Sequence, residues 1–109
     1  MFEIYTISNF DREFKKLAKK YPSIIVDLQI LIRELAENPF QGDPLGKDCY
    51  KVRMAITSKN KGKSGGSRII TYVKIVNKSV TLLSIYDKSA QNDIADAFLI
   101  QLLEDNQLL

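Results

Sequence analysis

Residues Cys49–Tyr86 read CYKVRMAITSKNKGKSGGSRIITYVKIVNKSVTLLSIY and form the basic centre of the chain. This stretch contains eight basic residues and no acidic residue, whereas the whole chain of 109 residues has a formal net charge of only +3. Met1–Asp48 is nearly balanced, with seven basic and eight acidic residues, and Ser89–Leu109 has four acidic residues and no basic one. A modest net charge therefore hides a strongly basic segment, and this asymmetry is the first indication of function.

Apolar runs on both sides of a loop within this stretch predict strands. Tyr50–Ile56 alternates between apolar and polar side chains, which is typical of a half-buried strand. After a glycine-punctuated basic loop, Arg68–Val76 and Ser79–Tyr86 predict two further strands, with a tight turn at Asn77-Lys78. Three successive strands most simply form an antiparallel meander. The first of them separates two sets of side chains, with Tyr50, Val52, Met54 and Ile56 on one face and Lys51, Arg53 and Ala55 on the other.

The segment at the start of the chain predicts a strand and a helix. Phe2–Ile7 alternates apolar and polar residues and includes β-branched and aromatic side chains, so we expect a first strand there. Ser8 or Asn9 is a suitable cap for a helix that follows at once. That helix ends at Tyr21-Pro22, because the residue before a proline avoids the helical region.

Signals for helix starts and ends also predict a second helix before the basic centre and a third helix after it. Ser23 is a suitable cap for a second helix with a wide apolar stripe, which Asn38-Pro39 ends, and the two helices form a helical hairpin. Phe40–Asp48 is rich in turn residues and predicts a connection without regular structure. The pattern becomes helical again from Ile94. The acidic residues of this last region are expected on its solvated face and comprise Asp93, Asp96, Glu104 and Asp105.

The order of predicted elements is β-α-α-β-β-β-α, which favours an α+β fold. We expect the helical hairpin and the C-terminal helix to pack on a mostly antiparallel sheet of four strands. The first strand is expected at an edge of this sheet or beside one of the other three. A chain of 109 residues is long enough for one apolar core, so residues 1–109 are interpreted as a single domain.

Composition excludes several kinds of chemistry and location. The chain has no histidine, so it has no Ser–His–Asp triad, no Cys–His pair and no histidine-liganded metal. Its one cysteine, Cys49, cannot form an intrachain disulfide and is expected to be a small core residue. Neither a secretory leader nor an apolar run of membrane-spanning length is present, so the cytoplasm is the expected location.

Three interpretations of the basic loop at residues 57–68 compete. It resembles an ordinary solvated hairpin loop, which is often rich in lysine and glycine. Gly62-Lys63-Ser64 also suggests a phosphate-binding P-loop, but Thr57 occupies the position of its first glycine and strands lie on both sides of the loop. The third interpretation is a site for RNA phosphates, which the computed pI of about 9.0 also favours. Its members would be Lys51, Arg53, Lys59, Lys61, Lys63 and Arg68.

The chain resembles the RelE/ParE superfamily of bacterial toxins, and within it the RelE/HigB branch of ribosome-dependent mRNA endonucleases. The resemblance covers nearly the whole chain, and the loop that leads into the strand from Arg68 is its most specific part. The motifs that carry it are Tyr50-Lys51-Val52-Arg53, the Gly-Lys-Ser-Gly-Gly loop at 62–66, Arg68-Ile69-Ile70-Thr71-Tyr72, and Leu82-Leu83-x-x-Tyr86-x-Lys88-Ser89.

This resemblance implies a reaction and a set of catalytic residues. Such toxins cut the mRNA codon in the ribosomal A site by attack of the 2′-hydroxyl on the neighbouring phosphate, so neither a metal nor a cofactor is implied. Arg68 matches an invariant arginine of the family and is expected to stabilise the phosphate. Lys51 is then the candidate base, Lys63 is expected to close over the phosphate, and Lys88 is a candidate general acid.

The remaining residues of the implied site would contact RNA. Arg53 is expected to bind a phosphate or stack on a base, and Lys59 and Lys61 extend the basic surface along the loop. Tyr86 either stacks on a nucleobase or is a core tyrosine, and both interpretations stay open.

Two positions depart from the family pattern. Ser89 stands where some members carry an arginine, and Ala95 stands near the place of a tyrosine in the final helix. The implied partners are the ribosome, its mRNA and an antitoxin protein, and no membrane. Alternatives are a ParE-like inhibitor of DNA gyrase without nuclease activity, and a degenerate toxin that only binds its antitoxin.

Overall fold

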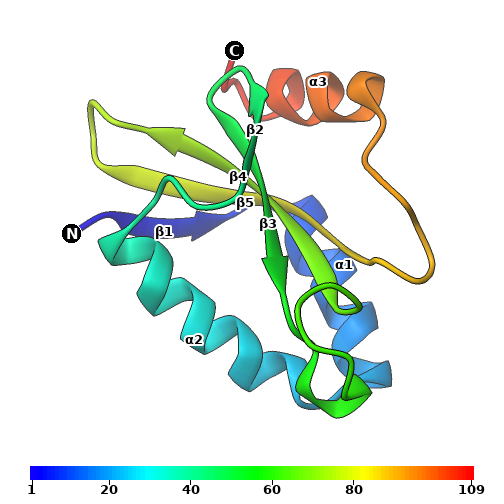
Figure 1. Cartoon of the computed structure of the whole chain (residues 1–109). Helices are drawn as coiled ribbons and strands as arrows, with labels where there is room; N and C mark the ends of the chain where they lie inside the picture. The colour runs from blue at the N-terminus through cyan, green and yellow to red at the C-terminus, as the bar shows by residue number, and fades with distance from the viewer.

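The computed structural model describes all residues, 1–109, and contains three α-helices and a five-stranded sheet. The predicted α+β class is confirmed (Figure 1). The elements are β1 (Glu3–Thr6), α1 (Ser8–Lys20), α2 (Ile24–Glu37), β2 (Asp43–Gly46), β3 (Cys49–Met54), a 3₁₀ turn (Thr57–Lys59), β4 (Ser67–Lys74), β5 (Ser79–Asp87) and α3 (Asp96–Asp105). This is the predicted order with one additional strand.

The additional strand is β2, so the prediction of a four-stranded sheet and of an irregular connection at Phe40–Asp48 is wrong at this point. β2 forms a hairpin with β3 across Lys47-Asp48, whose φ angles are 54° and 63°. Two successive residues with positive φ form the type of turn that matches the twist of paired strands. The sequence pattern missed it because Pro44 and Gly46 are rare in strands, although an edge strand tolerates both.

The strands lie in the order β1-β5-β4-β3-β2. The pairs β3–β4 and β4–β5 are antiparallel, which confirms the predicted meander, and β1 lies at one edge, parallel to β5. Between β4 and β5 the register shifts at Ile70/Thr71. The carboxylate of the α1 residue Glu13 binds β5 at this irregularity. It accepts hydrogen bonds from the Ser84 hydroxyl (2.8 Å) and the Ile85 N–H (3.2 Å).

Alternate strand residues supply two separate apolar cores, one on each face of the sheet. Val52 and Met54 of β3 join α1 and α2 in the first core, and Cys49 joins α3 in the second (Figure 1). Cys49 is 1% exposed, which confirms its predicted place in the core. Burial and the neighbouring Asp48 carboxylate raise the pKa of the Cys49 thiol to about 11, so this cysteine is protonated at neutral pH.

The two helices of the hairpin lie as predicted, but their predicted caps are used differently. α1 begins at Ser8 without a side-chain capping bond, and Asn9 donates to the Leu83 carbonyl of β5 instead (3.0 Å). Ser23 precedes α2 but accepts a hydrogen bond from the N–H of Ser58 in the basic loop (2.9 Å). Both side chains therefore join a helix to a distant segment. None of the helices combines the length and apolar character needed to cross a membrane.

Candidate nucleic-acid site

Three of the predicted site residues surround one hollow beside β3, which we name the basic hollow. Lys51 and Arg53 alternate along β3 with buried Val52 and Met54, and Lys63 reaches the hollow from the loop between β3 and β4. The hollow has a volume of about 250 Å³. Its lining residues are Gln41, Gly42, Asp43, Lys51, Val52, Arg53 and Lys63. Three of its lining side chains are cations and only Asp43 is a carboxylate, which makes it a suitable place for a polyanion.

Gly42 allows the chain before β2 to lie close to β3 and so to form one wall of this hollow. Its φ is +90°, and a β-carbon at this position would overlap the carbonyl oxygen of Lys51. Only glycine combines the positive φ with the absence of a side chain. A small residue that sequence analysis placed in a simple connection thus shapes the site.

Arg68 lies next to this hollow in a row of residues across the sheet. The register pairs Arg53 of β3 with Arg68 of β4, and Arg68 with Tyr86 of β5. Arg68 is only 5% exposed, and its guanidinium donates to the carbonyl oxygens of Lys63 (3.1 Å), Ser64 (3.2 Å) and Ser67 (3.2 Å). These bonds use three of its five N–H donors. Arg68 therefore holds the loop that carries Lys63, and two of its five donors have no hydrogen-bond partner within the protein.

Lys59 does not lie at the basic hollow. Its ammonium is 2.7 Å from the carboxylate of Asp87, and both side chains are buried, with 8% and 4% exposed. The phenol of Tyr21 also donates to Asp87 (2.9 Å). Burial disfavours the charged carboxylate, but the hydrogen bonds from Lys59, Ser89 and Tyr21 outweigh it and hold the pKa of Asp87 well below its usual range. The structure thus gives this lysine a partner inside the protein, at the base of the loop.

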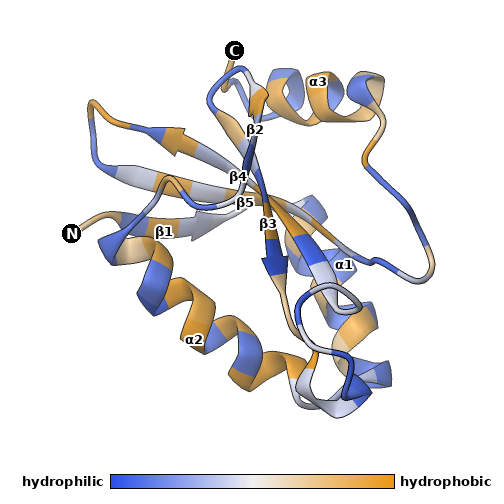
Figure 2. Ribbon diagram, in the orientation of Figure 1, coloured by the Kyte–Doolittle hydropathy of each residue, from blue (hydrophilic) through white to orange (hydrophobic).

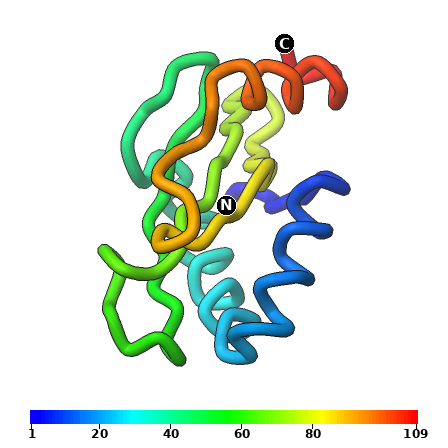
Figure 3. The backbone as a smooth tube through the Cα atoms, turned by 90° about the vertical axis from the view of Figure 1, so that its right-hand side faces the viewer, coloured from blue at the N-terminus to red at the C-terminus, as the bar shows by residue number.

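Tyr86 is buried in the second core and is linked to Lys51 through one carboxylate. The Asp93 Oδ1 lies 3.4 Å from the Lys51 ammonium and 3.5 Å from the Tyr86 hydroxyl. Burial and the Asp93 charge raise the pKa of the Tyr86 phenol, so it stays protonated and donates this bond. The mostly hydrophilic segment from β5 to α3 that carries Asp93 runs back along the sheet (Figures 2 and 3). Tyr86 is therefore a core tyrosine in this arrangement, and stacking on a base requires that segment to move.

The other predicted residues occupy the loops around the hollow. The Lys88 ammonium donates to the backbone carbonyl of Asn92 (3.0 Å) and to its side chain (3.2 Å), within its own segment. Lys61 is exposed on the basic loop and makes no side-chain hydrogen bond or ion pair. Ser89 donates to Asp87 through its hydroxyl (2.7 Å), and Ala95 is the residue before α3. Of these two departures from the family pattern, Ser89 thus has a local structural role.

Asp93 is a residue of this site that sequence analysis missed. It was expected on the solvated face of the last helix, but α3 begins at Asp96, and Asp93 lies before it over β3. The backbone N–H of Ile94 and the ammonium of Lys51 hold the pKa of Asp93 below its usual range. The charge asymmetry of the sequence was the available signal, because acidic residues after a basic centre can fold back onto it. No group of three or more acidic or cysteine residues suited to a metal ion is present.

The fold has known counterparts, although no protein-family model matches the sequence. One is E. coli toxin RelE in the free state, in a form with two arginines changed to alanine; it superposes with a TM-score of 0.64 at 18% identity, covering 95% of this chain and 96% of that chain. The isolated E. coli RelE toxin gives a TM-score of 0.61 at 17% identity, covering 96% and 99%.

The chain therefore has the RelE fold, and the resemblance seen in its motifs is confirmed at the level of the fold. Identity this low establishes architecture, and one architecture can serve several activities. Function has to be argued from the residues at the basic hollow.

Proposed function

We propose that this chain is the toxin of a type II toxin–antitoxin system and cleaves mRNA in the ribosomal A site. The observation that carries the proposal is the basic hollow: Lys51, Arg53 and Lys63 face one space, with Arg68 adjacent, on the fold of a toxin. Cations that converge from a strand and a loop suit a phosphodiester better than a neutral ligand.

The reaction needs only side chains of this kind. The 2′-oxygen attacks the adjacent phosphorus, the bond to the 5′-oxygen breaks, and a 2′,3′-cyclic phosphate and a 5′-hydroxyl are left. Lys51 accepts the proton of the 2′-hydroxyl once its side chain has left Asp93 and given up a proton to solvent, and Lys88 donates a proton to the leaving 5′-oxygen. The Lys88 role requires its ammonium to leave Asn92, with which it is hydrogen-bonded. Arg53, Lys63 and the two unused donors of Arg68 stabilise the charge on the pentacoordinate phosphate.

Two loop lysines differ in this proposal. Lys61 is exposed and contributes to the attraction of RNA. Lys59 holds the loop through Asp87, and we assign it no RNA contact because its ammonium is buried in that ion pair.

The same hollow suits an acidic segment of an antitoxin. Asp93 already places one carboxylate on Lys51, so a partner with several acidic residues would complement the remaining cations. We therefore infer an antitoxin that covers the basic hollow, and action in the cytoplasm, where translating ribosomes are found.

The experiment that tests the activity is a primer-extension analysis of a defined mRNA on translating ribosomes. Wild type is compared with Lys51→Ala and Arg53→Ala, and with Lys74→Ala as a matched control, since Lys74 is exposed and lies outside the hollow. We expect cuts within A-site codons for wild type and Lys74→Ala, and a loss of about 100-fold or more for the other two.

An uncut mRNA with well-folded wild type would contradict nuclease activity. Inhibition of DNA gyrase would then be measured next. Binding of an antitoxin without either activity would indicate a degenerate toxin, an alternative to which the replacements at Ser89 and Ala95 give weight.

A further inference from the structure

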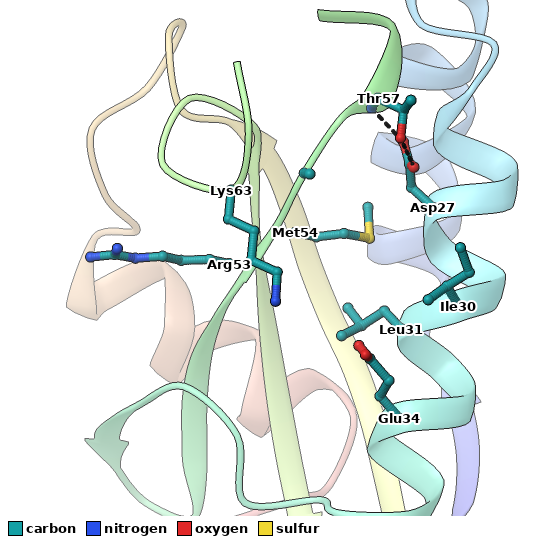
Figure 4. Close-up of a pocket in the computed structure, with 9 residues that line it drawn as sticks. Asp27, Ile30, Leu31, Glu34, Arg53, Met54, Thr57 and Lys63 are labelled. Carbon is teal, nitrogen blue, oxygen red and sulfur yellow. Dashed lines mark hydrogen bonds between the residues drawn. The ribbon is translucent and has the colours of Figure 1, made fainter. Parts of the chain in front are cut away.

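A second hollow adjoins the basic hollow and shares Arg53 and Lys63 with it. It lies between α2 and β3 and has a volume of about 220 Å³ (Figure 4). We name it the α2 hollow. Its lining residues are Asp27, Ile30, Leu31, Glu34, Arg53, Met54, Ala55, Thr57 and Lys63. A ligand that reached from one hollow to the other would pass Arg53 and Lys63.

Part of the wall of the α2 hollow is apolar, and its two carboxylates differ in what they bind. Ile30 of α2 and Met54 of β3 contribute to opposite sides of it (Figure 4). Asp27 is fully engaged, because it accepts hydrogen bonds from the N–H of Thr57 (2.9 Å), from the Thr57 hydroxyl and from Ser23 (3.3 Å). Asp27 therefore fixes the 3₁₀ turn that follows β3 to α2.

The Glu34 side chain, by contrast, accepts no hydrogen bond and forms no ion pair; it is exposed to solvent and is one of the residues that line the hollow. The ammonium of Lys63 is also without a partner, and the two do not pair with each other. Figure 4 shows them entering the same space from α2 and from the loop. The α2 hollow thus offers one free acceptor and one free donor beside an apolar surface.

We propose that the α2 hollow is a subsite for one nucleobase of the RNA, and that Glu34 selects bases with an exocyclic amino group. This inference rests on the proposed function, because the phosphate next to that base would lie in the basic hollow. A nucleobase is flat and apolar on its faces, and its edge carries donors for Glu34 and an acceptor for Lys63. An acidic peptide would be repelled by Glu34, and a basic peptide by Arg53 and Lys63, so neither fits equally well.

The carboxylate also discriminates against one base. Guanine, adenine and cytosine each present an amino group to Glu34 beside an acceptor for Lys63. Uracil has only a ring N–H between two carbonyl oxygens, so one of these oxygens would face the carboxylate without a donor between them. An unpaired polar contact of this kind is the usual source of strong selectivity between similar ligands.

The subsite can be tested without catalysis by nuclear magnetic resonance on the labelled full chain. GMP, AMP, CMP and UMP are titrated separately, with inorganic phosphate as the reference for the basic hollow alone. We expect GMP, AMP and CMP to shift the amide signals of Ile30 and Glu34, and UMP to bind on the order of tenfold more weakly. Inorganic phosphate should shift signals around Lys51 and leave those of Ile30 and Glu34 in place.

Glu34→Gln is the decisive variant, because its amide can donate to a uracil carbonyl. We expect it to remove the preference against UMP, whereas Glu37→Gln, one turn further along α2 and outside the hollow, should keep it. Shifts confined to the basic hollow for all four nucleotides would overturn the proposal. So would an unchanged ranking in Glu34→Gln, or shifts at Ile30 and Glu34 produced only by an antitoxin peptide.

Cleavage on the ribosome gives a second readout that separates this inference from the activity itself. Wild type and Glu34→Gln are compared on A-site codons that differ only by uracil at one position. Cleavage with the same codon ranking in both proteins would overturn the subsite and leave the nuclease proposal intact. Absence of cleavage in wild type would contradict the nuclease, and the nucleotide titrations would then decide the subsite alone.

Discussion

The ammonium of Lys51 on β3 lies 3.4 Å from the carboxylate of Asp93, a residue 42 positions later in the chain. In this ion pair a carboxylate lies beside Lys51, the side chain that acts as general base in the proposed reaction. The same carboxylate accepts the Tyr86 hydroxyl (3.5 Å) and the N–H of Ile94 (2.9 Å). Asp93 therefore ties the segment before α3 to the sheet and occupies Lys51 in the free protein.

Replacement of Asp93 by asparagine should free Lys51 with little cost to folding. Asp93 is 61% exposed, and exposed ion pairs contribute about 0–1 kcal/mol, so we expect the free energy of unfolding to change by less than about 1 kcal/mol. Association with RNA should become about two- to fivefold tighter, because RNA no longer has to break an ion pair of up to about 1 kcal/mol. Fluorescence anisotropy with a labelled oligonucleotide measures this, with Asp96→Asn as control. Equal affinity in wild type and Asp93→Asn would show that the ion pair does not compete with RNA.

Arg68 should be essential both to the loop and to the anion site, and two variants separate these roles. Arg68→Ala removes three hydrogen bonds to loop carbonyls and should lower the free energy of unfolding by about 2–3 kcal/mol. Arg68→Lys keeps the charge but cannot reproduce the planar fork, so it should recover part of the stability and little of the cleavage. Urea unfolding and cleavage on ribosomes are measured for both. Full cleavage by a folded Arg68→Lys variant would show that the reaction requires only the positive charge of Arg68 and not its planar guanidinium.

The buried pair of Lys59 and Asp87 should make stability depend on pH in the acid range. The pKa of Asp87 lies below its usual value in the folded protein, whereas an unfolded aspartate titrates near 3.9, so the unfolded chain takes up the proton first. The contribution of Asp87 is therefore complete above about pH 5 and declines as the pH falls below about 4. Asp87→Asn should unfold more easily at pH 7 and lose less stability than wild type between pH 5 and 3.

Urea unfolding midpoints at several pH values check this, with Glu104→Gln on the exposed face of α3 as control. Lys59→Ala at pH 7 should cost about 3–5 kcal/mol, because it leaves a buried carboxylate without its cation. If Asp87→Asn followed the pH dependence of wild type, another group would have to account for acid unfolding.

Binding of single-stranded RNA should weaken steeply with salt, because the hollow replaces counterions of the phosphates. Each phosphate contact contributes about 0.7 to the slope of the logarithm of affinity against the logarithm of salt concentration. Lys51→Ala, Arg53→Ala and Lys63→Ala should each reduce that slope by about this amount, and Lys78→Ala, at the far turn between β4 and β5, should not. A slope unaffected by all three substitutions would place the phosphates elsewhere on the protein.

Much of the fold follows from local patterns that the sequence displays directly. Alternation along β3 separates Lys51 and Arg53 from Val52 and Met54, because successive side chains of a strand point to opposite faces. The prolines after Tyr21 and Asn38 end both helices of the hairpin, since a residue before proline leaves the helical region. The hairpin of β2 and β3 was missed, because β2 contains Pro44 and Gly46, which are rare in strands.

The sequence by itself thus determined the class of fold and the concentration of positive charge around β3 and the loop. Only the tertiary structure decided which of those charges are free. Lys59 pairs with Asp87 across 28 residues, Lys51 pairs with Asp93 across 42, and Arg68 turns inward to the loop carbonyls, while Arg53 and Lys63 stay open. Periodicity is a property of near neighbours and can be read along the chain. The partner of a charged side chain is fixed only when distant segments meet, because that is when burial and pairing compete with solvation.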